Sequence, residues 1–138
     1  MITKLNVDDR TEVLTNISSQ RFLKALLTAK VFLRTLPNEP FGMSVVEAMA
    51  AGCVPVVPRD GGSWFDILDQ KQGEYGYSYG SLKEAANVIK MLLENDDLRM
   101  EVSARAVKRA MDFDSSAFEK KILRIVEEVY SRKSGLSA

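Results

Sequence analysis

The chain has 138 residues, of which 46% are apolar and 28% charged, and its 19 basic and 19 acidic residues cancel to a formal net charge of zero. These values are typical of one soluble globular domain, and the balanced charge argues against a nucleic-acid-binding surface. The single cysteine excludes an internal disulfide, and the lack of histidine excludes histidine-based triads, zinc ligands and general bases within the chain.

The first part of the chain predicts a polar lead followed by a strand and a helix. Residues 1–10 are polar, and we expect them to be poorly ordered. TEVLTNI, at 11–17, predicts a short strand. SSQRFLKALLTA, at 18–29, predicts a helix that Ser18 or Ser19 can cap.

Two apolar runs further along predict buried strands. VFLRTL, at 31–36, predicts a strand that is buried on both faces. VPVVP, at 54–58, predicts a second buried strand, whose two prolines either place it near a sheet end or demand an irregular ladder. Between them, GMSVVEAMAAG at 42–52 predicts a helix that ends at Gly52 in a left-handed conformation. A glycine loop, RDGG, follows the second strand.

The rest of the chain predicts mostly helix, and serine or acidic residues mark where the helices begin. The expected elements are a short helix at 63–68, a strand near 75–78, and helices at 81–95, 96–113 and 115–133. The expected caps are Ser81 with Glu84, Asp96 or Asp97, and Ser116 with Glu119.

Strands that alternate with helices predict an α/β fold with a parallel, Rossmann-like sheet and helices on both faces. Ligands of such sheets bind outside the carboxyl ends of the strands. Two loops, 37–42 and 59–62, should leave that edge next to each other. We therefore expect a binding site between these loops.

Two glutamates lie near this edge. Glu39 is on the first loop, and Glu47 lies inside the helix that follows. A helix that begins near Gly42 directs the amides of Met43, Ser44 and Val45 toward the crevice, which suits a phosphate. If its apolar sequence neighbours form the core, Glu47 is buried and needs hydrogen-bond donors, such as the hydroxyls of a sugar. The pattern therefore fits a sugar nucleotide.

A plainer interpretation of the two acids is also open on spacing alone. Glu39 could be an exposed loop acid. Glu47 could face solvent or form a salt bridge, for instance with Arg34 or Arg59. Neither acid would then contact a ligand.

The longer pattern resembles a known family. EPFGMSVVEAMAAGCVPVV, followed by GGSWFDIL, closely resembles the C-terminal nucleotide-sugar domain of retaining GT-B glycosyltransferases of family four, the group 1 type. The signature is an acid, seven residues and an acid, here Glu39 and Glu47, then E-A-M-A-x-G-x-P-V-V and a glycine pair. Asp66 stands where the family usually has a glutamate. The resemblance covers about residues 11–130 and looks most like mannosyltransferases of lipid-linked oligosaccharide assembly.

The resemblance implies a role for each acid. Glu39 would bind the donor-sugar hydroxyls as the catalytic-site acid, and Glu47 would bind the ribose. The resemblance also implies a GDP- or UDP-sugar donor, retention of anomeric configuration with the leaving phosphate as base, and no metal or other cofactor. Gly61 and Gly62 could contact the phosphate or base, or form a plain turn. Backbone around sugar and phosphate would come from Phe41, Gly42, Met43 and Ser44.

The chain also departs from the family. A full enzyme of this kind has an N-terminal acceptor domain, and its C-terminal domain opens with a strand and helix that carry an Arg and a Lys for the diphosphate. Neither is found here, so we expect a domain at 11–133 that lacks its first βα unit, with a frayed tail at 134–138. We do not expect this chain to be active alone.

The implied partners are a nucleotide sugar, an acceptor glycan or lipid, and the missing acceptor domain or a partner chain, with no nucleic acid. A sheet edge left unpaired also predicts a homo-oligomer. The N-terminus has no apolar signal core, so we expect a cytoplasmic location, with peripheral membrane association left open. Two alternatives to a transferase remain: a non-catalytic nucleotide-sugar-binding module that needs a partner chain, and a pure interaction domain.

Overall fold

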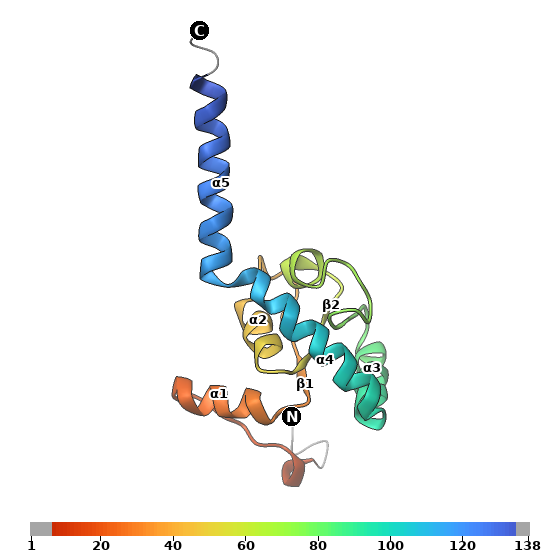
Figure 1. Cartoon of the computed structure of the whole chain (residues 1–138). Helices are drawn as coiled ribbons and strands as arrows, with labels where there is room; N and C mark the ends of the chain where they lie inside the picture. The colour runs from red at the N-terminus through yellow and green to blue at the C-terminus, as the bar shows by residue number, and fades with distance from the viewer. Residues whose placement is uncertain (1–6, 135–138) are drawn as a thin grey trace.

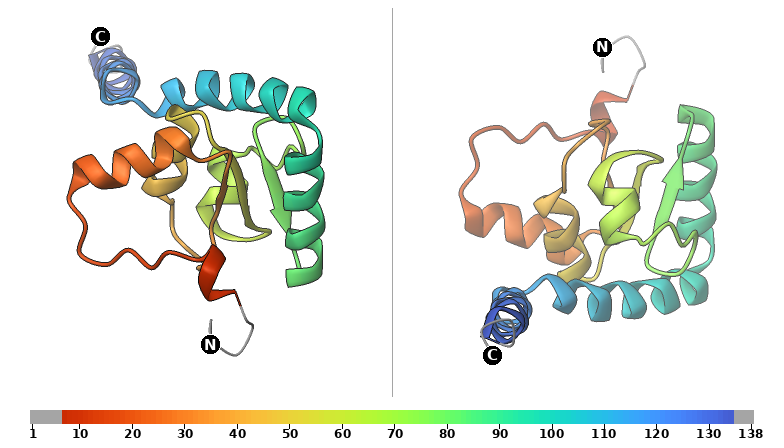
Figure 2. Two further views of the ribbon diagram at one scale, coloured as in Figure 1. Left: turned by 90° about the horizontal axis from the view of Figure 1, so that it is seen from below. Right: turned by 90° about the horizontal axis from the view of Figure 1, so that it is seen from above.

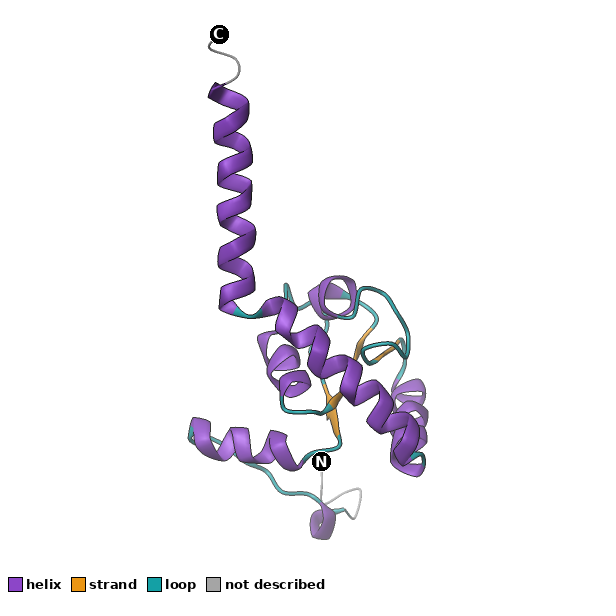
Figure 3. Ribbon diagram, viewed as in Figure 1, coloured by secondary structure: helices purple, strands orange, loops and turns teal. Residues whose placement is uncertain are grey.

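The computed structural model describes residues 7–134 and has the expected α/β fold (Figure 1). Three parallel strands form one sheet in the order β1-β2-β3, so β2 is central and the other two strands are its edges. Figure 3 shows these strands inside a shell of helices. The strands are β1 (Val31–Leu33), β2 (Val54–Pro58) and β3 (Tyr77–Tyr79).

Helices connect the strands and close the chain, as the apolar periodicities predict. Both views in Figure 2 put α1 and α3 on opposite sides of the body. The α-helices are α1 (Ser19–Thr28), α2 (Met43–Ala50), α3 (Leu82–Glu94), α4 (Asp96–Ala110) and α5 (Ser115–Ser134). Shorter turns are the 3₁₀ turns η2 (Asp8–Arg10) and η4 (Met111–Phe113) and the π-helical turn η3 (Ser63–Ile67).

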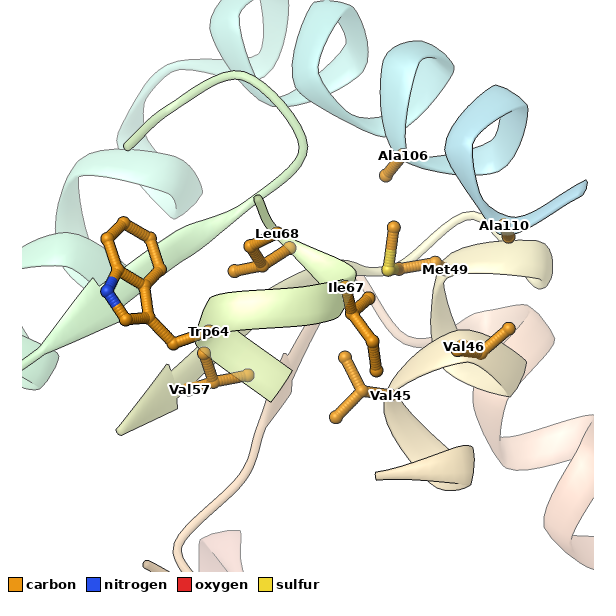
Figure 4. Packing of buried hydrophobic residues seen from close by; sticks show 9 residues of the cluster. All are labelled: Val45, Val46, Met49, Val57, Trp64, Ile67, Leu68, Ala106 and Ala110. Atoms are coloured by element: carbon orange, nitrogen blue, oxygen red, sulfur yellow. The ribbon is translucent and has the colours of Figure 1, made fainter. Parts of the chain in front are cut away.

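The main core lies between α2, η3, α4 and one face of β2. All five residues of β2 are buried, as its continuous apolar run predicts. Figure 4 shows side chains from these four elements gathered in one cluster, and Arg109 of α4 fixes η3 by donating to the carbonyls of Asp66 and Ile67. The cluster consists of Val45, Val46, Met49, Val57, Trp64, Ile67, Leu68, Ala106 and Ala110.

A second cluster lies on the other face of β2, against α3. Its buried members are Val54, Val56, Tyr79, Ala85, Leu92 and Val102. Helix α4 contributes to both clusters, because Val102 packs here and Ala106 packs in the main core. Helices therefore cover both faces of the sheet, as expected.

The strand predicted at 11–17 is wrong. These residues form no strand, and Val13 is 67% exposed. An extended segment becomes a strand only when another strand pairs with it. Here the described sheet ends at β1, so the segment runs as irregular chain to Ser18, which caps α1 by accepting from the Arg21 amide at 3.3 Å.

The strand predicted at 31–36 is shorter and less buried than expected. β1 ends at Leu33, and that side chain is 41% exposed. The reason is its edge position: β1 pairs with β2 along one side, and the described sheet has no strand beyond it. The third predicted strand, at 75–78, is found at Tyr77–Tyr79 instead.

Helix ends were predicted with mixed success. Gly52 has φ +91°, the left-handed conformation expected after α2, and Ser81 caps α3 by accepting from the Glu84 amide at 3.2 Å. The cap of α4 is Asn95, whose Oδ1 accepts from the Leu98 amide. Asp96 and Asp97, which were predicted as caps, are instead the first two residues of the helix. Helix α5 begins before Ser116, and the Ser116 hydroxyl donates to Asp114 at 2.6 Å.

Helix α5 extends away from the rest of the molecule (Figure 1). Four apolar side chains that share one side of it by their spacing are exposed, and they are Phe118, Ile122, Ile125 and Val129. Within residues 7–134, no helix is both long enough and apolar enough to span a bilayer. Poor order was predicted for residues 1–10, of which 8–10 form the turn η2, and fraying was predicted for 134–138, of which Ser134 is the last residue of α5. Residues 1–6 and 135–138 lie outside the described range.

Candidate functional site

The loop that carries Glu39 leaves the carboxyl end of β1. Glu39 forms an ion pair with Arg34, with 2.5 Å between Arg34 Nη2 and Glu39 Oε2. Both side chains are only 22% exposed. The interpretation of Glu39 as an exposed loop acid is therefore wrong. Arg34, which was considered as a partner for Glu47, pairs with Glu39 instead.

Three hydrogen bonds fix this loop to the neighbouring loop after β2. The Asn38 amide donates to Asp60 Oδ1 at 2.9 Å. The Gly62 amide donates to the Glu39 carbonyl at 2.9 Å, and the Ser63 hydroxyl donates to the Phe41 carbonyl at 3.2 Å. The two loops predicted to lie side by side at the sheet edge are thus in direct contact.

Gly61 and Gly62 make this contact possible because they have no side chain. A Cβ on Gly61 would lie 2.5 Å from the Glu39 carbonyl oxygen, and a Cβ on Gly62 would overlap the Pro40 carbonyl. Gly61 also has φ +62°, in the left-handed region that favours glycine. The glycine pair therefore packs against the backbone of the Glu39 loop, which is a more specific role than the plain turn considered from the sequence.

Helix α2 begins directly after this loop. Gly42 is its N-cap, with φ +98°, and it is buried beside Glu39 and Ser63. Within the described residues, the amides of Met43 and Ser44 make no hydrogen bond, whereas the Val45 amide donates to the Gly42 carbonyl at 2.9 Å. Two of the three predicted amides are therefore free to bind an anion at the positive end of the helix.

Glu47 is exposed, so its predicted burial is wrong. Val46 and Ala48 are buried on either side of it, yet Glu47 lies on the outer face of α2 with Met43 and Ala50. These three positions are four and three residues apart, the spacing of one helix face. No ion pair of Glu47 with Arg34 or Arg59 forms, because those arginines pair with Glu39 and Glu84.

Glu47 lines a pocket of about 470 Å³ between α2, α4 and the start of α5. Phe113 lies at this pocket and packs edge-on against Phe41, with 5.5 Å between ring centroids. Glu39 is not among the residues that line the pocket. The pocket lining is Met43, Val46, Glu47, Ala50, Val107, Ala110, Met111, Phe113, Asp114 and Ser115.

Arg59, at the carboxyl end of β2, has a structural partner. It forms an ion pair with Glu84, and its Nε donates to the Ser78 hydroxyl at 3.1 Å. Glu84 Oε2 also accepts from the Gly80 amide at 2.8 Å, and these two partners, the amide first, lower the pKa of Glu84 below its ordinary value. Arg59 thus links β2 to the start of α3.

The sequence located the two loops and the acids but missed how the first loop is fixed. Arg34 was considered only for Glu47, and neither Asp60 nor Ser63 was singled out. One signal was present: Arg34 directly follows the residues of β1, and Glu39 comes five residues later, after Pro37. Among the described residues, no three potential metal ligands of the His, Cys, Asp or Glu types come together.

A family model and several named proteins match this chain. A family model described as "Glycosyl transferases group 1" matches residues 1–109. A GDP-Man:Man(3)GlcNAc(2)-PP-Dol alpha-1,2-mannosyltransferase of Dictyostelium discoideum is 30% identical over 129 residues, which are 94% of this chain and 25% of the relative. A phosphatidyl-myo-inositol mannosyltransferase of Mycobacterium leprae is 33% identical over 108 residues, 76% of this chain and 28% of the relative.

Solved structures share the fold. Sucrose-phosphate synthase of Thermosynechococcus elongatus has a TM-score of 0.80 at 20% identity, over 95% of this chain and 33% of its own. HepE of Anabaena, solved in complex with UDP-glucose, has a TM-score of 0.77 at 23% identity, over 92% and 35%. The chain spans about a quarter of the length of the mannosyltransferases that it matches. By the match of the family model to most of its residues, the chain belongs to the group 1 glycosyltransferases.

Proposed function

We propose that this chain is the donor-binding part of a retaining glycosyltransferase, and that its donor is GDP-mannose. The observation that carries the proposal is the fixed Glu39 loop, which brings a carboxylate beside the free amides at the start of α2. A carboxylate accepts hydrogen bonds from sugar hydroxyls, and helix amides bind phosphate. A sugar joined to a diphosphate presents both groups in one molecule.

The choice of donor is supported by the names of the relatives. The relative in Dictyostelium is named for GDP-mannose, and the relatives there and in Mycobacterium are both mannosyltransferases. Both names also describe an acceptor joined to a lipid, a dolichyl diphosphate in one and phosphatidylinositol in the other. We propose a lipid-linked acceptor for this chain as well, which would bring it to a membrane surface.

In this proposal the two acids act on different parts of the donor. Glu39 accepts from the sugar hydroxyls, and Glu47 accepts from the ribose. The acceptor hydroxyl attacks the anomeric carbon on the face from which the diphosphate leaves, and its proton passes to the leaving phosphate oxygen. One glycosidic bond forms as the bond from sugar to phosphate breaks, with retained configuration and no metal required.

Glu47 can take this role without a change in the fold. Its carboxylate is exposed on the outer face of α2, and no ion pair of it within the described residues has to break before it binds a hydroxyl. The adjoining pocket of about 470 Å³ has a mostly apolar lining, which suits the ring of a nucleobase. We propose that guanosine binds here, with the diphosphate at Met43 and Ser44 and the sugar at Glu39.

The test is ligand titration of the full chain, followed by NMR. We expect GDP and GDP-mannose to perturb the amides of Met43 and Ser44, and we expect GDP-mannose to bind more tightly. Glu47→Gln should weaken both ligands equally. Glu39→Ala should abolish the preference for the sugar nucleotide. No binding of either ligand at millimolar concentration would overturn the proposal.

A second unit is needed for turnover in this proposal, because the chain spans only about a quarter of its mannosyltransferase relatives. The exposed apolar side chains along α5 favour such a unit, which would bind the acceptor. The check is an assay of the chain alone with GDP-mannose and a lipid acceptor. Donor binding without transfer is expected, and transfer by the chain alone would contradict this part.

A further inference from the structure

Arg34 is fixed in place by hydrogen bonds from its backbone to the other two strands of the sheet. Its amide donates to the Val56 carbonyl of β2 at 2.9 Å. Its carbonyl accepts from the hydroxyl of Tyr79 in β3 at 2.7 Å. The Tyr79 side chain is buried, so this bond is shielded from water. The Arg34 side chain therefore starts from a rigid point at the carboxyl end of β1.

From that point the guanidinium forms an ion pair with the carboxylate of Glu39. Nη2 of Arg34 lies 2.5 Å from Oε2 of Glu39, and Oε2 is buried. Within the described residues, no hydrogen bond reaches the other oxygen, Oε1. The contact thus sets the direction of the carboxylate and leaves one of its two oxygens available.

The pair is poorly built for stability alone. Arg34 Nε and Glu39 Oε2 are both buried, yet neither makes a hydrogen bond within the described residues. Arginine can form two parallel bonds with a carboxylate, and that geometry best offsets the cost of taking both charges out of water. A buried group without a partner calls for an explanation other than stability.

We propose that Arg34 is a positioning residue for the donor sugar, an inference that rests on the proposed function. It holds the Glu39 carboxylate in a fixed orientation, so that Oε1 accepts a hydroxyl of the bound sugar. The ion pair that Arg34 forms within the described residues is with Glu39, and it has no hydrogen bond with the amides of Met43 and Ser44. Its contribution is therefore to the choice of sugar and not to the affinity for the nucleotide.

The experiment measures the ratio of two dissociation constants, those of GDP and GDP-mannose, for the full chain. Arg34→Gln removes the charge and should lower the preference for GDP-mannose by about tenfold, with the dissociation constant of GDP unchanged. Arg34→Lys keeps a charge at this position and should restore part of the preference. Arg124→Gln, which breaks an exposed pair with Glu128 on α5, is the matched control and should change neither value.

A double-mutant cycle tests whether Arg34 acts through Glu39. In the Glu39→Gln background, Arg34→Gln should cause no further loss of preference, because the oriented carboxylate is already gone. Saturation-transfer NMR gives a second readout of the same point. The signal from mannose protons should fall relative to guanine H8 in Arg34→Gln, and the guanine signal should persist.

Four outcomes would overturn the inference. Equal weakening of GDP and GDP-mannose by Arg34→Gln would indicate a purely structural role. Additive effects of Arg34→Gln and Glu39→Gln would show that the two act separately. If wild type prefers GDP-mannose and Arg34→Gln keeps that preference, the positioning role of Arg34 is wrong but the proposed function still stands. If wild type binds neither ligand, the proposed function fails and this inference falls with it.

Discussion

Glu39 and Glu47 belong to one short signature, but the structure gives them opposite surroundings. Glu39 is 22% exposed, is paired with Arg34 and lies on a loop with three hydrogen bonds to its neighbour. Glu47 is exposed on the outer face of α2 and has no ion-pair partner among the described residues. One carboxylate is oriented before any ligand arrives, and the other can rotate until a ligand binds.

This difference separates two ways of contributing to binding. An oriented group loses little conformational entropy when the ligand arrives, and it rejects ligands whose hydroxyls point elsewhere. A mobile surface group loses side-chain entropy on binding but adapts to its partner. The end of the site at Glu39 is thus suited to selecting a sugar, and the end at Glu47 to retaining a nucleotide.

The largest expected effect comes from Gly62→Ala, which tests whether the scaffold fixes Glu39. The new methyl group would overlap the Pro40 carbonyl and the Phe41 Cα, so the loop must move. We expect a loss of about 3 kcal/mol in urea unfolding, with NMR shifts at Glu39 and not at Glu47. Gly80→Ala is the control, because its Cβ would meet only Glu84 Oε2 and Arg59 Nη1, at 3.6 and 3.7 Å. Equal stability of the two variants would contradict the close contact.

A direct comparison of the two acids is next in size. Glu39→Ala leaves the partly buried Arg34 without its partner and should cost about 2 kcal/mol of unfolding free energy. Glu47→Ala removes an exposed side chain and should change stability by no more than about 0.5 kcal/mol. Urea unfolding of both variants in one buffer checks the difference. The reverse order would mean that Glu47 is the acid tied into the fold.

Ser63→Ala sharpens the comparison with a smaller change. It removes the hydroxyl that donates to the Phe41 carbonyl and should cost about 1 kcal/mol. Ser44→Ala is the matched control on α2, because Ser44 makes no side-chain hydrogen bond within residues 7–134. Thermal unfolding of the pair gives the difference. A larger loss of stability in Ser44→Ala than in Ser63→Ala would mean that the side chain on α2, and not the contact with the Glu39 loop, contributes more to the fold.

The smallest effect concerns Glu84, a partly exposed glutamate with two fixed partners. The Gly80 amide and then Arg59 lower its pKa, so the ionised form stabilises the fold at pH above its ordinary value of 4.5. That stabilisation is lost as the pH falls through the lowered pKa. The advantage of wild type over Glu84→Gln in thermal unfolding should therefore shrink between about pH 6 and pH 3. An advantage that grows in acid would reverse the sign and contradict this assignment.

Local sequence patterns predicted much of the fold because they act over a few residues. The Ser81 cap, the left-handed Gly52 and the buried run of β2 each depend on neighbours in the chain. The strand predicted at 11–17 failed because a strand also needs a partner, and the sequence does not say which segments pair. The same limit made β1 shorter than its apolar run.

The candidate site was predicted in its parts and not in its arrangement. The burial of Glu47 was misjudged because its sequence neighbours Val46 and Ala48 are buried, whereas its neighbours on the helix face, Met43 and Ala50, are exposed. The pairing of Arg34 with Glu39 depends on the shape of the turn between them. That shape is set by contacts with the loop after β2, which no local pattern encodes.

The bond from the Gly62 amide to the Glu39 carbonyl also makes the site observable by hydrogen exchange. An amide exchanges with solvent deuterium only when its bond opens, and bonds in loops and in sheets open with different free energies. The Arg34 amide, bonded to Val56 in the sheet, reports opening of the fold, and the Gly62 amide reports opening of the loop. The ratio of their protection factors therefore measures how often Glu39 leaves its place while the sheet remains intact.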